Sequence, residues 1–497
     1  MRGINKIFFF LVALTGTFFG TALHAQNSST SPYSRYGIGD LLFNGFSKNL
    51  GMGGIGQGVN QSLNLNPLNP ASYSGLWLTT YEAGVNMSLE QIASDKIVQS
   101  SNTASLGYFA FGFPVKTKKW GMGFGLLPYS NVGYAVEESK INSIGGIETH
   151  SYKGSGGLNQ FYITNGFSLA KNFSAGVTAS YLFGVVNQDR RVEFLDPSYY
   201  NTNISNSNSL GWFHFNFGLQ YTFDSLNIAP SDSIRSIDKQ LKIDKDSVSK
   251  LNKLIDFTSD GDQKSAFLAQ RITIDSMMLV QQEMRASIQN RVTKSDWDFT
   301  LGLSFAPAAD LRARQSLFAY NFRYYNSAER DQVVIRDTIS NTEGVKGNVR
   351  LPMSGSLGFA FKKGNRWLFG SDYSIQQWSD YSSFGHSDSL VDSWKVNVGG
   401  QFTPNERAIK SYWKQVQYRL GFHYAKTFLE FNGTHLDEMA ATIGFGFPIR
   451  RAGTTVQLSA EAGKRGTLQN NLVEEKYLRF TLGFSLNDRW FIKPKYD

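Results

Sequence analysis

Six histidines and the serines are the residues of this 497-residue sequence that could carry catalysis or bind a metal. No Gly-x-Ser-x-Gly elbow or phosphate-binding loop occurs where a strand would feed a helix. Because the sequence contains no cysteine, thiol catalysis, cysteine-ligated metals and disulfide scaffolds are excluded. The histidines show no metal-ligand spacing, and they are His24, His150, His214, His386, His423 and His435. The sequence therefore predicts no catalytic site, no metal site and no cofactor.

The first 25 residues indicate export from the cytoplasm. Arg2 and Lys6 precede an apolar run from Ile7 through Phe19, and small Ala25 lies where a signal peptidase would cut. The run is shorter than the roughly 18–20 residues that a membrane-spanning helix needs. No later apolar stretch is long enough for such a helix, so the mature chain crosses a membrane as a closed β-barrel or not at all.

Alternation with a period of two is the strongest pattern. In segment 213–223, Phe213, Phe215 and Phe217 interleave with His214 and Asn216, and segments 416–422, 443–447 and 477–486 repeat the pattern. One face of each strand is thus apolar and aromatic, and the other is rich in Gly, Ser, Asn and Thr. A soluble sandwich also alternates, but its polar face carries many charges. We expect a lipid-facing apolar band around a polar lumen.

Fourteen strands are predicted, the even number expected of a bacterial barrel. Tight turns at 116–120, 171–173, 363–366 and 450–453 follow even-numbered strands, and long connections near 137–157, 191–208, 326–352 and 464–475 follow odd-numbered ones. We expect the tight turns to face the periplasm. The predicted strands lie near 76–88, 103–115, 121–136, 158–170, 174–190, 209–223, 297–325, 353–362, 367–378, 393–402, 415–428, 438–448, 454–463 and 476–487.

Residues 224–296 interrupt this order after the sixth strand, between barrel segments 76–223 and 297–497. Asp, Lys, Ser and Gln dominate the segment, and its apolar residues have helical spacing, as at Met277, Val280 and Met284. We predict a helical or partly disordered periplasmic insertion. It is either a tolerated insertion or a docking element, through residues 225–296, for a protein partner.

Residues 26–75 are dense in Gly, Asn and Pro yet too apolar for a disordered tail. A barrel of fourteen strands is wider than the eight-stranded kind that side chains alone can fill. We therefore expect these residues to form a hatch inside the lumen.

The sequence resembles the FadL/TodX family of outer-membrane transporters for hydrophobic compounds. The resemblance rests on Gly51-Met52-Gly53-Gly54, on Asn69-Pro70-Ala71 before the first strand, and on segments 351–359 and 367–379. It implies fourteen strands, an N-terminal hatch, and passive movement of fatty acids or aromatic hydrocarbons that leave through a kink in the third strand. Pro128 lies in the predicted third strand and cannot donate to the ladder, so it marks either that opening or a simple bulge.

The leading functional expectation is an outer-membrane barrel for passive uptake of hydrophobic compounds, in contact with membrane lipid. The expected substrate-binding residues of the hatch are Tyr33, Tyr36, Ile38, Asn69, Pro70 and Ala71. The alternative is a non-transporting subunit of an outer-membrane assembly or protein-secretion complex. A nucleic-acid partner is not expected, because the net charge of +9 is spread along the chain without a dense basic stripe.

Overall fold

The computed structural model describes residues 30–43, 45–95, 97–141, 146–196, 198–223, 230–295, 297–325, 332–449 and 453–488. The expected signal peptide, residues 1–25, and the tail after Asp488 lie outside the described residues.

The chain folds into a closed antiparallel β-barrel of fourteen strands, which confirms the predicted fold class. Two barrel strands are each interrupted at a proline, Pro307 and Pro352, so β8 continues as β9 and β10 continues as β11. Pairing of β18 with β2 closes the ring. The strands are β2 (Thr79–Ala93), β3 (Val98–Lys116), β4 (Trp120–Ile141), β5 (Ile147–Ala170), β6 (Phe173–Phe194), β7 (Asn201–Phe223), β8 (Asp298–Ala306), β9 (Ala309–Tyr324), β10 (Val333–Leu351), β11 (Ser354–Lys363), β12 (Trp367–Gln376), β14 (Ser393–Phe402), β15 (Gln417–Phe431), β16 (Thr434–Ile449), β17 (Thr454–Gly466) and β18 (Glu474–Asp488).

The alternation read from the sequence separates the two faces of the wall as expected. On β7, Phe213, Phe215 and Phe217 are 43–48% exposed, whereas Gln220 is 2% exposed. The outward face therefore forms an apolar band, and the inward face carries polar side chains.

Three of the four predicted long connections, 137–157, 191–208 and 326–352, are wrong, because most of their described residues continue the strands, whereas 467–473 of the fourth do form a connection. Residues 137–157 contain the paired ends of β4 and β5, and residues 326–352 contain all of β10. These segments lie beyond the apolar band, and their apolar residues are too scattered to mark one continuous face. Alternation detects a strand only where one face is apolar, so it could not show them.

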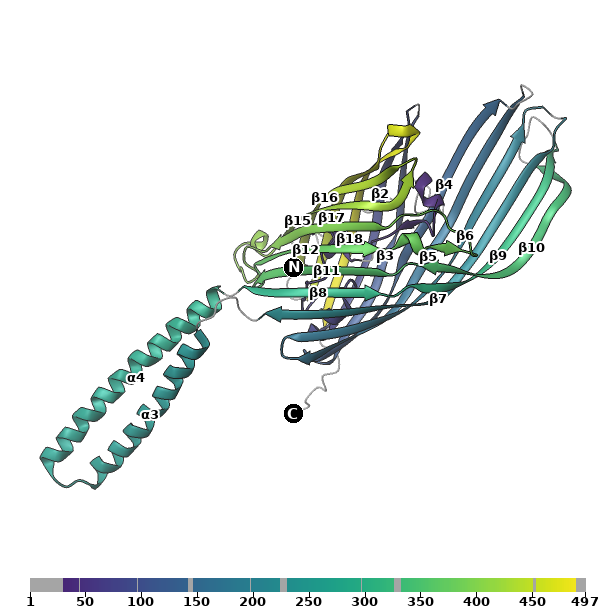
Figure 1. Cartoon of the computed structure of the whole chain (residues 1–497). Helices are drawn as coiled ribbons and strands as arrows, with labels where there is room; N and C mark the ends of the chain where they lie inside the picture. The colour runs from purple at the N-terminus through teal and green to yellow at the C-terminus, as the bar shows by residue number, and fades with distance from the viewer. Residues whose placement is uncertain are drawn as a thin grey trace, which may run out of the picture.

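The tight turns at 117–119, 171–172 and 364–366 lie at one end of the barrel, called here the lower end. At the opposite, upper end the wall is not continuous. Pairing of β3 with β4 stops at Phe109 and Leu126, while β4, β5, β6, β7, β9 and β10 continue upward together. We call this six-stranded extension, residues 127–160, 182–211 and 309–351, the upper sheet; it rises beside the remaining strands in Figure 1.

The N-terminal segment lies inside the barrel, as predicted for a hatch. It contains η1 (Pro32–Arg35), a two-residue strand β1 (Asp40–Leu41), α2 (Ser47–Leu50) and η2 (Pro70–Gly75). Its apolar side chains are almost fully buried, with Ile38, Met52, Ile55 and Tyr73 at 0–1% exposed. Short elements η3 (Trp378–Asp380), β13 (Ser382–Ser383), η4 (Tyr412–Lys414) and η5 (Gln469–Asn471) lie in connections between barrel strands.

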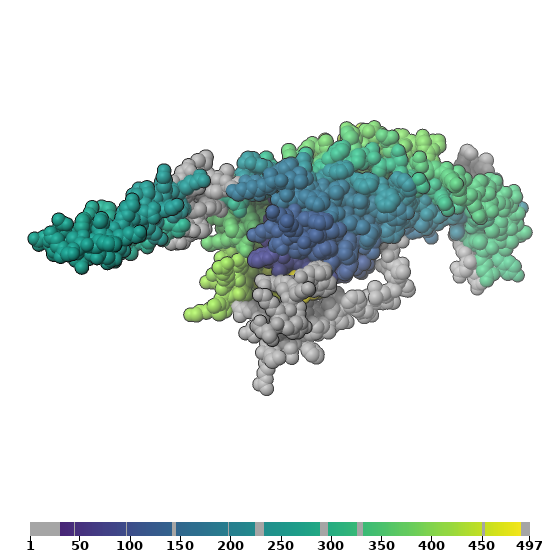
Figure 2. All heavy atoms as spheres, turned by 90° about the horizontal axis from the view of Figure 1, so that it is seen from below, coloured from purple at the N-terminus to yellow at the C-terminus, as the bar shows by residue number. Residues whose placement is uncertain are grey.

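Between β7 and β8, the predicted insertion is a hairpin of two long helices, α3 (Pro230–Phe257) and α4 (Gly261–Ser295). Leu251 and Ile255 are buried between the helices, and Gln281 and Arg285 of α4 bond to Asp244 and Asp238 of α3. The hairpin projects from the lower end and stands clear of the barrel in both views (Figures 1 and 2). Among the described residues, no helix carries a stretch apolar and long enough to cross a bilayer.

Candidate functional site

The lower lumen is filled by the hatch, which contacts the wall backbone directly. At Gly302 on β8 an added Cβ would coincide with the carbonyl oxygen of Gln57, and at Gly121 on β4 with that of Tyr73. Other wall glycines face hatch atoms at similarly short range: Gly112, Gly166, Gly176, Gly218, Gly399, Gly421 and Gly444. The glycine-rich inner face therefore allows the hatch backbone to approach the wall.

Two wall carboxylates fix the hatch through its backbone. Asp372 on β12 accepts hydrogen bonds from the amides of Gly56 and Gln57, at 2.6 and 2.9 Å. Glu82 on β2 accepts one from Leu65, at 3.0 Å. These contacts satisfy hatch amides that have no ladder partner.

A buried lysine of the hatch lies in the same region. Lys48 on α2 donates to Gln61 and, at 2.6 Å, to Asn64, and its side chain is 7% exposed. Burial, reinforced by the nearby guanidinium of Arg419, holds the pKa of Lys48 well below its usual range.

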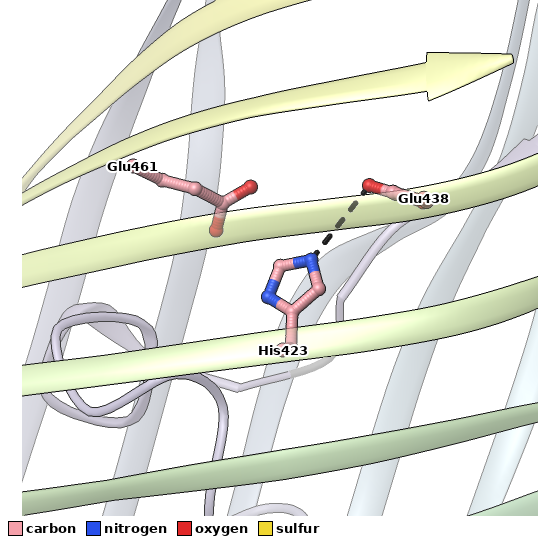
Figure 3. A group of neighbouring side chains, drawn as sticks. All are labelled: His423, Glu438 and Glu461. Carbon is pink, nitrogen blue, oxygen red and sulfur yellow. Dashed lines mark ion pairs between the residues drawn. The ribbon is translucent and has the colours of Figure 1, made fainter. Parts of the chain in front are cut away.

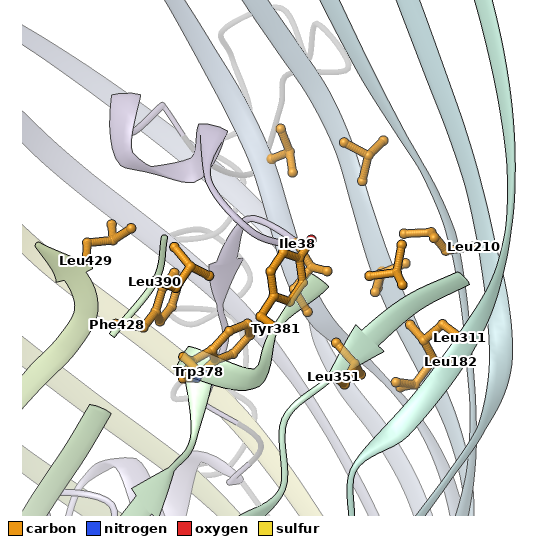
Figure 4. Close-up of a cluster of buried hydrophobic side chains, with 14 of the residues drawn as sticks. Ile38, Leu182, Leu210, Leu311, Leu351, Trp378, Tyr381, Leu390, Phe428 and Leu429 are labelled. Atoms are coloured by element: carbon orange, nitrogen blue, oxygen red, sulfur yellow. The ribbon is translucent and has the colours of Figure 1, made fainter. Parts of the chain in front are cut away.

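Above the packed region, apolar side chains from the hatch and the wall form one cluster (Figure 4). Ile38 lies in this cluster beside Tyr381, and Trp378 stacks on Phe428 with ring centroids 4.5 Å apart. Upper-sheet residues complete it, namely Leu182, Leu210, Leu311 and Leu351, all 0–6% exposed. This is the apolar part of the lumen.

Three of the residues predicted to bind substrate lie at this level. The hydroxyl of Tyr33 donates to the carbonyl of Val473 at 2.7 Å, and burial raises the pKa of Tyr33 to about 12, which keeps that proton in place. Tyr36 is partly buried, with its ring centroid 5.0 Å from that of Phe431. Ile38 is 1% exposed.

The other three, Asn69, Pro70 and Ala71, lie apart from them in the lower lumen. The Asn69 side chain caps η2 by accepting from the Ala71 amide at 3.0 Å, and it donates to carbonyls of β7 and β8. Pro70 lies against Gly176 and Gly218. These contacts attach the hatch to the wall and do not line the apolar cluster.

Pro128 lies where β3 and β4 separate. The last paired residue of β4 on the β3 side is Leu126, and the β4–β5 register shifts between Pro128 and Ser130. On the vacated edge of β4 the hatch strand β1 pairs instead, with Asp40 opposite Asn131 and Leu41 opposite Ser130. We call this gap between β3 and β4, partly closed by β1, the seam.

A polar cluster lies on the inward face of β15, β16 and β17 (Figure 3). His423, Glu438 and Glu461 of β15, β16 and β17 have possible ligand atoms within 4.8 Å of one another, and His423 Nε2 is 3.8 Å from Glu438 Oε1. The guanidinium of Arg479 on β18 lies 3.3 Å from Glu461 Oε1 and 3.9 Å from Glu438 Oε1. Because Arg479 already supplies the positive charge between the carboxylates, the cluster is an ion-pair network.

Spacing along the chain could not reveal that cluster, because its members come from neighbouring strands. Asp372 and Glu82 were missed for a similar reason. The one available signal was an isolated acidic residue at a lumen-facing strand position close to glycine, as in Gly370-Ser371-Asp372.

Comparisons with known proteins bear on both fold and family. No curated protein matches the sequence. A family model described as BamG matches residues 4–280 and 258–497, which together span nearly the whole chain.

Two solved structures with the same fold are bacterial toluene transporters. The toluene transporter TbuX of Ralstonia pickettii is similar over 90% of this chain and 100% of its own, at 12% identity and a TM-score of 0.50. The toluene transporter TodX of Pseudomonas putida is similar over 91% of this chain and 100% of its own, at 13% identity and a TM-score of 0.50. The predicted resemblance to the FadL/TodX channels is confirmed at the level of the fold.

Proposed function

The chain belongs to the BamG family, and from this membership and the α3–α4 hairpin we propose that the protein is a subunit of an outer-membrane assembly complex. The hairpin is its docking element for a protein partner. This proposal takes up the second of the two functions expected from the sequence.

The observation that carries the proposal is apolar surface on α4 facing away from α3. One row at helical spacing consists of Leu268, Ile272 and Leu279, which are 40–67% exposed. A second row contains Met277, Val280 and Met284, at 53–60%. Apolar rows on a projecting helix are typical of helix-in-groove recognition, in which they anchor the helix to a partner.

Features of the lower rim support placing the hairpin in the periplasm. Three turns of two or three residues lie at this end, at 117–119, 171–172 and 364–366, as at the periplasmic end of bacterial barrels, although short turns also join β2 to β3 and β15 to β16 at the upper end. Tryptophans occur beside the turns, with the Lys118 ammonium 5.8 Å from the Trp77 ring centroid and that of Lys363 5.7 Å from the Trp297 ring centroid. Such residues anchor a barrel at the interface between lipid and water. A hairpin beyond this rim would be in reach of periplasmic proteins.

The test is co-purification of the full-length barrel with its partners from native membranes. We expect Ile272→Glu combined with Leu279→Glu to reduce partner recovery at least tenfold, since each buried aliphatic side chain contributes about 1.5–3 kcal/mol. The matched control is Gln270→Glu with Gln282→Glu, which adds the same charge at exposed polar positions of α4.

Heat-dependent migration on gels reports whether each variant barrel is folded. Equal recovery of partners with both double variants would contradict docking through α4. Loss with the apolar-row variant alone supports it.

A second candidate function is favoured by the seam: lateral passage of an apolar molecule between β3 and β4. The apolar cluster around Ile38 borders the seam, since Ser130 on β4 donates to the Ile38 carbonyl at 2.8 Å. The packed hatch below leaves the side of the barrel as the direct route into the membrane. The passive uptake expected from the sequence would use this path, with Tyr33, Tyr36 and Ile38 touching the solute and Pro128 keeping the strands apart.

A disulfide between β1 and β4 tests the second candidate. Leu41→Cys with Ser130→Cys places thiols at directly paired positions of a protein that has no other cysteine. In proteoliposomes we expect the oxidised variant to lose uptake of an apolar dye, and reduction to restore it. The control disulfide, Thr455→Cys with Ser485→Cys, joins β17 to β18. Uptake that does not depend on oxidation would reject this route.

A further inference from the structure

The outward face of the upper sheet carries a group of cations just above the apolar band. Leu311, Ala313, Val349 and Leu351 of β9 and β10 are buried at 0–3% on the inward face. By strand alternation, the residues one or three positions away from these belong to the outward face. There, Arg350 pairs across the strands with Asp310, and Lys346 pairs with Arg314. All four are exposed, and three of them are cations.

A cavity of about 410 Å³ lies beside these cations, where β13 pairs with the edge of β10. Lys346 and Arg350 contribute positive charge to its lining, Asp310 contributes one negative charge, and Asn348 and Ser382 contribute hydrogen-bonding groups. The cavity is therefore both concave and positively charged on balance, which favours an anionic group.

The connection that covers the cavity adopts a costly backbone. Phe384 also lines the cavity, and its φ of 51° lies in the left-handed region that bulky residues rarely enter. Its ring lies so close to Gly347 that a Cβ there would overlap it. A strained aromatic residue that helps to shape a concave site is a hallmark of binding sites.

The apolar band begins immediately below. Phe305 on β8 is 45% exposed and Leu357 on β11 is 55% exposed, a few residues before Asp310 and after Arg350 respectively. Met353, between Arg350 and Leu357, is 38% exposed. A ligand held at the cavity would thus have apolar wall directly beneath it, and a molecule with an anionic head and acyl chains matches that order.

We propose that this cavity binds the phosphorylated headgroup of a membrane lipid in the leaflet at the upper end of the barrel. Lys346 and Arg350 contact the phosphate, and the acyl chains lie along the apolar band below Met353. The charged groups of the site are on the outward face of β9 and β10, away from the seam and the hairpin, and Phe384 also packs against the apolar cluster of the lumen.

Native mass spectrometry of the detergent-purified full-length protein tests the site with phosphatidic acid as the probe. We expect Lys346→Gln with Arg350→Gln to weaken binding at least tenfold. The matched control is Lys464→Gln with Lys476→Gln, an exposed cross-strand pair of β17 and β18, and it should change binding less than twofold. Equal loss in both variants, or in neither, would overturn the proposal.

Two further experiments ask whether the cavity prefers a lipid to a free anion, and whether binding depends on the shape of the cavity as well as on its charge. Diacylglycerol with the same acyl chains should bind weakly, and inorganic phosphate should not displace phosphatidic acid at equal concentration; full displacement would mean an anion site without lipid preference. Gly347→Ala leaves every charge in place but forces Phe384 to move. It should also weaken binding, and unchanged binding would show that the cavity plays no part.

Discussion

In the lower barrel, fourteen strands close into a ring whose glycine-rich inner face touches the hatch backbone, whereas in the upper sheet six strands continue with two edges. The β4 edge is covered at Ser130 and Asn131 by β1, and the β10 edge at Val349 and Arg350 by β13. β10 also carries three register shifts, which are known to discourage pairing with other chains. One wall thus combines a rigid, filled part with an open part whose edges are only partly covered.

Within the barrel wall, the tightly packed part is therefore the lower ring, and the proposed binding sites are in the upper sheet. Each close contact between hatch and wall in the lower barrel limits movement, because packed interiors do not deform continuously. The upper sheet has the seam, the apolar cluster and the cationic cavity, which are the parts of the wall proposed to receive a small molecule or a lipid, whereas the proposed protein partner docks on the hairpin below. Four substitutions test this division.

The largest expected effect is at the hatch–wall contact. Gly302→Ala places a Cβ where the Gln57 carbonyl oxygen lies, so the hatch or β8 must shift. We expect a loss of more than about 3 kcal/mol in the free energy of unfolding. Gly355→Ala on β11 is the control, since the nearest atom to its new Cβ would be 4.0 Å away. Denaturant titration followed by gel mobility measures both, and equal stability would refute the packed lower barrel.

A smaller effect is expected when the hatch loses one anchor. Asp372→Ala leaves the amides of Gly56 and Gln57 without their acceptor, at a cost of about 2 kcal/mol. The hatch should then become cleavable by protease at lower denaturant concentration than in the wild type. Asp337→Ala, at an exposed position of β10, serves as the control and should leave the cleavage profile unchanged.

The contact between the two regions is tested at β1. Gly39 has a φ of 97° and lies against the Asn131 carbonyl, so Gly39→Ala adds both strain and overlap, about 1–3 kcal/mol confined to the seam. Amide hydrogen exchange should accelerate at residues 129–133 and not in β16–β18. The control is Gly433→Ala. Gly433 has a φ of 75°, but no atom lies within 4 Å of the new Cβ, so this variant adds backbone strain without steric overlap. Faster amide hydrogen exchange throughout the barrel would mean that the seam and the fourteen-stranded lower barrel open as one cooperative unit.

The smallest expected effect is a dependence on pH. The pKa of Lys48 is held low by burial, so the folded state disfavours the charged form. This penalty is largest below the folded pKa and disappears as pH rises to the pKa of the unfolded chain, about 10.4. Relative to Lys48→Met, the wild type should therefore gain thermal stability between pH 7 and pH 10. A difference in Tm that stays constant or shrinks would contradict the burial of a lysine in the hatch.

Much of the lower barrel was predictable, because its chemistry is local and periodic. Fourteen strands followed from alternation at segments such as 213–223, and the hatch followed from apolar residues in a segment too rich in Gly and Pro for a strand. The insertion was recognised by its change in composition. Its helices followed from spacing such as that of Met277, Val280 and Met284.

The upper sheet was not predictable by the same means. Residues 137–141 are nearly all polar, and in 333–348 apolar residues such as Val333 and Ile335 do not form a continuous apolar face. The pairing of both segments continues that of the strands below. Pro128 is visible in the sequence as an interruption, but only the pairings show that β3 leaves β4 near it and that Pro307 lies beside the break at Pro352. The sequence also could not show that Tyr33, Tyr36 and Ile38 lie at the apolar cluster while Asn69, Pro70 and Ala71 lie in the lower lumen, because this depends on how the hatch folds back on itself.

The pairing of β18 with β2 has a consequence for how the molecule is made. It brings Glu474 beside Ala93, so the ring is completed by segments from opposite ends of the chain, and the entropic cost of closing so long a loop makes this a late event. The hatch directly precedes β2 and is enclosed by the same pairing. Because the hatch lies inside the ring, it must already be in the lumen when β18 pairs with β2.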